Sequence, residues 1–191
     1  TTQLKLLGER LEQRGYRVLY TREPGGTPVG EAVRKILLDP QHNELNPVAE
    51  SLLYAAARAQ HVAQVIKPAL LEGQIVLCDR FVDSSLAYQG FARGLSIELL
   101  DKINELATAG LRPDLVLLLD FVSEAGLERI AGAGRAADRI EQESLAFHRK
   151  VRDGYLTLAR RDPQRYRVID ANGTIEQIHR DILGFVEEIL A

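Results

Sequence analysis

The chain has 191 residues, 46% of them hydrophobic and 27% charged, a composition typical of a folded globular protein and not of a disordered one. Its net charge of -3 argues against a general nucleic-acid binder, and no apolar run is long enough to cross a membrane. Its single cysteine, Cys78, lies in an apolar run, which favours a reducing compartment.

Helices and short strands alternate along the sequence. The apolar spacing predicts helices at residues 2–14, 29–38, 47–72, 83–91, 96–109, 123–130, 141–161 and 174–190, with a kink near Pro68. Strands are expected at residues 16–21, 74–78, 114–120 and 166–170. Strands such as IVLC and LVLLL are apolar on both faces, which is typical of a parallel sheet covered by helices on both sides. The sequence therefore predicts one α/β domain spanning residues 1–191.

Each expected strand ends in polar or charged residues or is directly followed by them. They are Arg22-Glu23, Asp79-Arg80, Asp120 and Asp170. Because the carboxyl ends of parallel strands meet at one edge and form ligand sites there, we expect these groups to lie together. An arginine in that place can bind phosphate through its planar fork, and Asp79 can orient Arg80. The same two residues can instead form a surface ion pair of little consequence.

Two sets of residues have the helical spacing that places side chains on one face. Tyr54 and Arg58 are four apart, and an aromatic ring with a guanidinium suits stacking on a base and donating to its carbonyl. Ser85, Tyr88 and Gln89 lie three and four apart, and both polar side chains donate and accept hydrogen bonds. Taken alone, the first set is better explained by a tyrosine in the core and a solvated arginine, and the second is also compatible with a helix cap at Asp83 or Ser84 and an exposed Gln89.

A third set of arginines surrounds the glycine-rich segment at residues 131–137. Arg129, Arg135 and Arg139 can close over phosphates as a flexible lid, or they can be scattered charges on a surface loop. The four histidines share no metal-binding motif, and no serine–histidine–aspartate arrangement is recognisable.

Taken together, the motifs resemble those of the bacterial thymidylate kinases. The matching stretches are TREPGGTPVGEAVRKILL, YAAARAQH, VIKPAL, VLCDRFVDSSLAYQGFARG, RPDLVLLLD and DRIEQE. They occur in the family's order over residues 1 to about 170. The resemblance implies a P-loop kinase that phosphorylates dTMP to dTDP with ATP and Mg²⁺. It also implies a three-layer α/β fold with a five-stranded parallel sheet, a lid at about 131–140, a homodimer and a cytoplasmic location.

The resemblance also bears on the start of the chain. The family's first strand leads into a phosphate loop, G-x-x-x-x-G-K-[ST], whose last position matches Thr1. The strand, the glycines and the lysine are not in this sequence, which contains no methionine. We therefore expect the natural protein to begin earlier and to supply a central strand between residues 74–78 and 114–120.

For dTMP, the resemblance implies a role for each matching position. Tyr54 would stack on thymine, Arg58 would donate to its carbonyl, Ser85 and Gln89 would read the edge of the base, and Tyr88 would pack against the deoxyribose. The acceptor phosphate would be bound by Arg34 and Arg80, with Asp79, Glu23 and Pro24 beside them. A cis peptide is expected before Pro24, as suits a tight turn.

For ATP, Thr1 and Thr2 would contact the phosphates, and Thr1 would also contact Mg²⁺. Arg129, Arg135 and Arg139 would lie over the donor phosphates, with Arg80, Arg135 and Arg139 stabilising the charge that develops during transfer. Asp170 and Ala171 would lie near adenine. Three other hypotheses remain open: a P-loop kinase for another monophosphate, a nucleotide-binding protein without catalysis, and a structural module.

Overall fold

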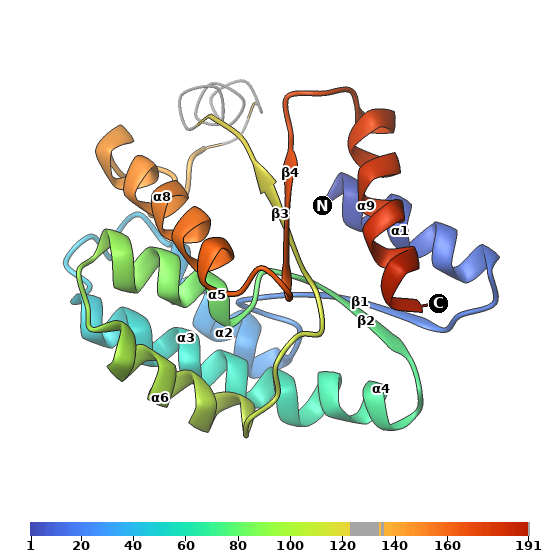
Figure 1. Ribbon diagram of the computed structural model, residues 1–191. Coiled ribbons are helices and arrows are strands. Elements are labelled where there is room, and N and C mark those ends of the chain that lie inside the picture. Colours follow the sequence, from blue (N-terminus) through green and yellow to red (C-terminus); the bar gives the residue numbers. More distant parts are fainter. Residues whose placement is uncertain (123–133, 135, 191) are drawn as a thin grey trace.

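A computed structural model describes residues 1–122, 134 and 136–190. The expected helix at 123–130, Arg129, Arg135 and most of the expected lid lie outside the described residues. The remaining elements follow the predicted alternation of helices and strands, shown in Figure 1.

The strands form two parallel pairs. β1 (Val18–Arg22) pairs with β2 (Ile75–Asp79), and β3 (Val116–Asp120) pairs with β4 (Tyr166–Asp170). Parallel pairing was predicted and is confirmed. The two pairs are separate sheets, and Figure 1 shows them running in different directions. Within the described residues, no strand bridges β2 and β3.

The strands are less buried than their composition predicts. Every residue of β2 is only part-buried, and Leu119 in β3 and Val168 in β4 are 39% and 47% exposed. Helices pack on both sides of β4, as expected, but they leave parts of the strands uncovered. Each described strand has a single hydrogen-bonded neighbour, so each is an edge strand whose apolar side chains are only partly covered.

Local capping explains where several helices begin. α2 (Pro28–Leu38) and α3 (Pro47–His61) each start with proline after a capping residue, Thr27 and Asn46, whose side chain accepts a backbone hydrogen bond. Serine side chains cap α6 (Ile97–Thr108) and α8 (Leu145–Arg161) in the same way, so α8 starts four residues later than predicted. α1 (Thr2–Gln13) and α9 (Ile175–Leu190) lie near the predicted bounds.

Two of the predicted helices contain a wide π turn. The expected helix at 47–72 is α3, then the π segment η1 (Val62–Ile66), then α4 (Lys67–Leu71). Pro68 lacks an N–H and its ring crowds the preceding turn, which is the physical reason for irregular pairing just before it. The expected helix at 83–91 is α5 (Val82–Ser85) followed by the π segment η2 (Leu86–Ala92).

The apolar core lies on both sides of β4. On one side α1 and α9 pack against it through the buried residues Leu7, Leu11, Ile169, Ala171, Ile178 and Ile182. On the other side η2, α6 and α8 pack through Leu86, Leu100, Leu158, Ala159 and Tyr166. This packing fixes η2 against α8, which sets the position of the predicted base-reading residues.

Candidate active site

In each strand pair, polar side chains lie next to each other at the carboxyl ends of the two strands. Register places Arg22 opposite Asp79 and Asp120 opposite Asp170. The hydroxyl of Thr1 donates to Asp79 Oδ2 at 3.1 Å, so the start of α1 lies against the end of β2. The predicted gathering of these residues is therefore confirmed within each strand pair.

The loop after β1 is held by hydrogen bonds to side chains of α2. The Glu23–Pro24 peptide bond is cis, as expected. Arg34 Nη1 donates to the carbonyl of Pro24 at 2.9 Å, and the backbone N–H of Gly26 donates to Glu31 at 3.0 Å. Gly26 has φ +76°, and a Cβ there would come within 2.6 Å of the His61 ring. Only glycine fits this position, so the loop backbone approaches α3 directly.

Arg58 lies at the centre of a buried polar cluster. Its side chain is 2% exposed. It donates through Nε to Glu23 at 2.7 Å, and through Nη1 to Asn104 at 2.7 Å and Ser85 at 3.1 Å. Glu23 also contacts His61 Nδ1 at 3.3 Å. A buried guanidinium is tolerated only when paired in this way, so the position of Arg58 is set before any ligand binds.

A second buried cluster surrounds Glu50, which is 0% exposed. Its carboxylate accepts from Gln89 Nε2 at 2.8 Å, from Arg139 Nη2 at 2.6 Å and from two nitrogens of Arg93 at 3.3 Å. Burial acts to raise the pKa of Glu50, but the hydrogen bonds from Gln89, Arg93 and Arg139 outweigh it and lower the pKa overall. Glu50 is therefore ionised at neutral pH.

The residues around Arg80 form a more open group. Arg80 directly follows β2 and has φ +72°, a conformation that is rare for residues with a side chain and that tends to occur at functional sites. Its guanidinium lies over the Tyr88 ring at 5.1 Å, and Nη1 donates to the Tyr88 hydroxyl at 3.2 Å. The thiol of Cys78 donates to the Arg80 carbonyl at 3.0 Å, and burial raises the pKa of that thiol.

The other tyrosines of the region are half-buried or buried. The Tyr88 ring packs against Phe147 and Tyr155, with centroids 6.1 and 6.4 Å apart. Burial raises the pKa of Tyr54, and the nearby charge of Glu50 acts in the same direction. Tyr54 is thus a neutral aromatic surface at neutral pH.

The residues predicted for ATP do not form such a cluster. Thr1 and Thr2 are exposed at the start of α1, and Asp170 is exposed and accepts from the side chain and backbone of Asn172. Arg139 is buried and bonded to Glu50 and to the carbonyl of Leu37 at 2.8 Å. The lid arginines Arg129 and Arg135 lie outside the described residues.

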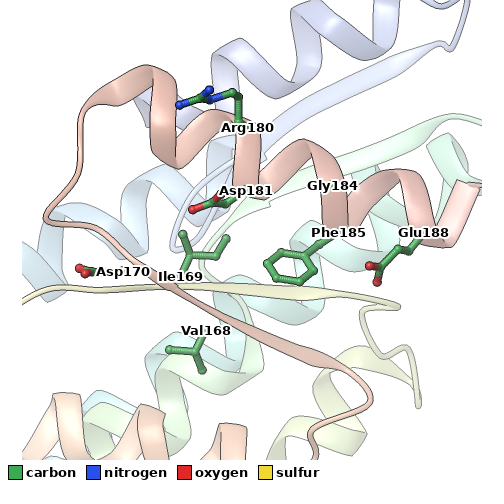
Figure 2. A pocket seen from close by; sticks show the side chains of 8 residues that line it. All are labelled: Val168, Ile169, Asp170, Arg180, Asp181, Gly184, Phe185 and Glu188. Carbon is green, nitrogen blue, oxygen red and sulfur yellow. The ribbon is translucent and has the colours of Figure 1, made fainter.

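A groove of about 360 Å³ runs between β4 and α9 (Figure 2). Its lining residues are Val168, Ile169, Asp170, Arg180, Asp181, Gly184, Phe185 and Glu188. Asp170 also lines a second hollow of about 310 Å³. None of the residues predicted to bind dTMP lines either hollow.

Comparison with known proteins decides the family. A family model described as "Thymidylate kinase" matches residues 1–182. The thymidylate kinase of Pelotomaculum thermopropionicum is 63% identical over 190 residues, covering 100% of this chain and 88% of that protein. That of Syntrophotalea carbinolica is 58% identical over 186 residues, covering 94% and 86%. The chain belongs to the thymidylate kinase family.

A solved thymidylate kinase agrees with this assignment. The crystal structure from Ehrlichia chaffeensis superposes with a TM-score of 0.79 at 32% identity, covering 97% of this chain and 90% of that one. The fold is therefore the α/β fold of the thymidylate kinases, and the enzyme phosphorylates dTMP to dTDP with ATP. None of the described helices has both the length and the apolar stretch needed to cross a bilayer.

Four buried residues of this thymidylate kinase escaped prediction from sequence. Glu50, His61 and Asn104 hold predicted residues in place, and Asp83 accepts hydrogen bonds from Tyr166 and Arg165. Glu50 precedes Tyr54 by four positions and Arg58 by eight, so helical spacing alone was enough to place it on their face. The other three contacts join segments far apart in sequence and left no local signal.

Proposed function

We propose that dTMP binds between α3 and η2, with its base read by Arg58, Ser85 and Gln89. The observation that supports this most strongly is the buried pairing of Arg58 with Glu23 and Asn104, which fixes a guanidinium beside Ser85. Tyr54 would stack on the thymine ring. Tyr88, whose ring is held by Phe147 and Tyr155, would pack against the deoxyribose.

The dTMP phosphate would bind at the end of β2. Arg80 supplies a charged fork there, and Arg34 is tied to the cis-proline loop through the Pro24 carbonyl. Asp79 and Glu23 would orient the guanidinium groups of Arg80 and Arg34. Their carboxylates would not touch the phosphate, because like charges repel. A bidentate guanidinium contact with phosphate is among the stronger charge-assisted hydrogen bonds in proteins.

ATP would bind on the side where α1 begins. Thr1 and Asp79 place a hydroxyl and a carboxylate oxygen 3.1 Å apart, and such hard oxygen donors suit Mg²⁺ with nucleotide phosphates as further ligands. Mg²⁺, when bound, would neutralise phosphate charge. Thr2, Asp170 and Ala171 would contact ATP, with Arg129, Arg135 and Arg139 above its phosphates. For Arg139, this role requires its bond to Glu50 to open.

In this reaction the dTMP phosphate oxygen attacks the γ-phosphorus of ATP in line. That oxygen is already anionic, so no strong general base is needed. The protein's contribution is to align the two nucleotides and to offset charge on the transferring group. Arg80 would do this from the acceptor side, and its fixed position at the strand end means that little reorganisation is required.

We further propose that the enzyme is a cytoplasmic homodimer. Val48 and Leu52 on α3 are 49% and 52% exposed, and Leu99 and Leu106 on α6 are 50% and 84% exposed. Their spacings of four and seven place each pair on one helix face. α3 and α6 lie side by side in Figure 1, so a second copy of this chain would cover both stripes. Light scattering at micromolar concentration checks this, and a monomer mass would contradict it.

The experiment that tests the function uses the full-length gene product with ATP and Mg²⁺. Phosphorylation is measured across dTMP, dUMP, dCMP, UMP, CMP, AMP and GMP. Strong preference for dTMP, with dUMP second, is the expected result. Preference for another monophosphate would overturn the roles given to Arg58, Ser85 and Gln89. Retained dTMP binding without turnover would favour a nucleotide-binding protein.

A further inference from the structure

Glu50 joins three parts of the molecule through one carboxylate. It lies on α3, and its donors are Gln89 in η2, Arg93 just after η2, and Arg139 from the far end of the expected lid. The side chain is 0% exposed. A carboxylate fully removed from water is costly unless hydrogen-bond donors pair with its oxygens. The buried carboxylate of Glu50 therefore requires these donors.

The bond to Gln89 determines which way that amide faces. An ionised carboxylate has no proton to donate and can only accept. The Nε2 group of Gln89 must therefore face Glu50, as it does at 2.8 Å, and its Oε1 must point elsewhere. Within the described residues, this Oε1 accepts no hydrogen bond. Gln89 thus presents an acceptor, although a free glutamine side chain can present either end.

The orientation of this amide matters because pyrimidines differ at one ring nitrogen. Thymine carries a hydrogen at N3 and donates there, whereas N3 of cytosine has a lone pair and accepts. A fixed acceptor pairs with thymine and repels cytosine. An unpaired or opposed polar group in a buried site discriminates more strongly than a lost apolar contact does.

We propose that Glu50 is a positioning residue for base selectivity, holding the Gln89 amide so that Oε1 faces N3–H of thymine. The inference rests on the proposed base-reading role of Gln89 and adds the group that gives Gln89 its direction. Glu50 touches no nucleotide in this scheme and acts through its neighbour.

The variant Glu50→Gln gives the sharpest test. Its amide oxygen should turn toward Arg139, whose guanidinium lies only 2.6 Å from Oε2 of the native carboxylate. The new NH₂ group would then face Gln89, which must turn its own Oε1 inward to accept. Nε2 of Gln89 would in consequence face the base, the arrangement that suits cytosine.

The readout is the ratio of kcat/KM for dTMP to that for dCMP, measured with the full-length enzyme. Effects through Arg139 fall on phosphates common to both substrates and cancel in this ratio. Gln89→Ala removes the amide altogether and favours neither base. We expect the ratio to fall in the order wild type, Gln89→Ala, Glu50→Gln, with at least about tenfold between the first and last.

Two further variants separate positioning from folding. Glu50→Asp keeps an acceptor-only carboxylate, so it should retain the preference for dTMP even where the rate falls. Glu98→Gln makes the same chemical change at an exposed position paired only with Lys102, and should match wild type. Thermal unfolding of every variant shows which are folded.

The outcomes distinguish the two levels of the proposal. A wild type without preference for dTMP, or a Gln89→Ala ratio equal to wild type, would refute the base-reading role itself. A lowered ratio in Gln89→Ala with a native ratio in Glu50→Gln would refute only the role of Glu50. Should Glu50→Gln fail to fold, NMR of the dTMP-bound wild type decides: a scalar coupling from Gln89 Nε2 to the Glu50 carboxyl carbon supports the proposal, and its absence overturns it.

Discussion

Two regions of the molecule, here called the acceptor side and the strand-end rim, differ in how far their charged side chains are buried. The acceptor side comprises Glu23, Glu50 and Arg58, and these three residues are at most 5% exposed. The strand-end rim comprises Thr1, Asp79, Arg80 and Asp170, where the side chains of Thr1 and Asp79 are 96% and 42% exposed. Buried charges must be paired within the protein, whereas exposed charges are hydrated when no ligand phosphate is bound. The proposed base site is therefore preorganised, and the proposed phosphate site would be completed by its ligands.

The largest effect should follow from breaking the buried pair. Glu23→Gln leaves the guanidinium of Arg58 without its charged partner at 2% exposure. We expect the free energy of unfolding to fall by about 3–5 kcal/mol. Urea unfolding measures this. Glu187→Gln breaks the exposed pair with Arg14 and serves as the control, with an expected loss of about 0–1 kcal/mol. Equal losses in the two variants would contradict the comparison.

Removing the charge at the rim should affect turnover more than stability. Arg80→Ala is expected to lower kcat by ~10²-fold or more, because it removes the charge proposed to lie beside the transferring group. Arg80→Gly makes the same deletion while suiting the backbone at φ +72°. Steady-state kinetics of both, with the exposed Arg160→Ala as control, measures the effect. Near-normal turnover would exclude this role for Arg80.

The ionisation of Glu50 predicts a pH dependence of stability. Its pKa is lowered in the folded protein, so its contribution is present above the ordinary value of 4.5 and is lost as pH falls through the folded pKa. The stability difference between wild type and Glu50→Gln should therefore be full at pH 7 and shrink as the pH is lowered through the folded pKa, below 4.5. Urea unfolding at several pH values tests this, and a constant difference down to pH 2 would contradict it.

The smallest effect should come from an exposed helical pair. Lys102 and Glu98 are four residues apart on α6, with side chains 69% and 80% exposed. We expect Lys102→Ala to cost about 0.3–0.5 kcal/mol, and this loss should disappear in 1 M salt. A salt-independent loss above 2 kcal/mol would show that exposure does not govern pair strength here.

Local signals in the sequence were sufficient for most elements. The strand at 166–170 has the predicted bounds, because a short apolar run lies there between polar segments. The helix at 47–72 was predicted from continuous apolar spacing, but the π turn at 62–66 was not, because spacing does not specify which carbonyl each N–H pairs with. Parallel pairing was predictable, and the division into two sheets falls between β2 and β3, where the family resemblance implied a further strand.

The candidate site divides in a similar way. Helical spacing predicted that Tyr54 lies near Arg58 and Ser85 near Gln89; the first two lie on α3, and the other two lie at the end of α5 and in η2. That Arg58 is bonded to Glu23 and Asn104 was beyond prediction, since those partners lie 35 and 46 residues away. Arg139 was expected above the donor phosphates, and the structure places it on Glu50. Its role in transfer, like those of Arg129 and Arg135, stays a prediction.

The hydrogen bond from Cys78 to the Arg80 carbonyl has a practical consequence for labelling. The chain contains one cysteine, and its thiol is part-buried with a raised pKa. Thiolates, not thiols, attack maleimides, so Cys78 should react slowly at neutral pH. A cysteine introduced at an exposed position, such as Glu98→Cys, would therefore react with a maleimide fluorophore much faster than Cys78 does. Nucleotide binding could then be followed by fluorescence without first replacing the native cysteine of these 191 residues.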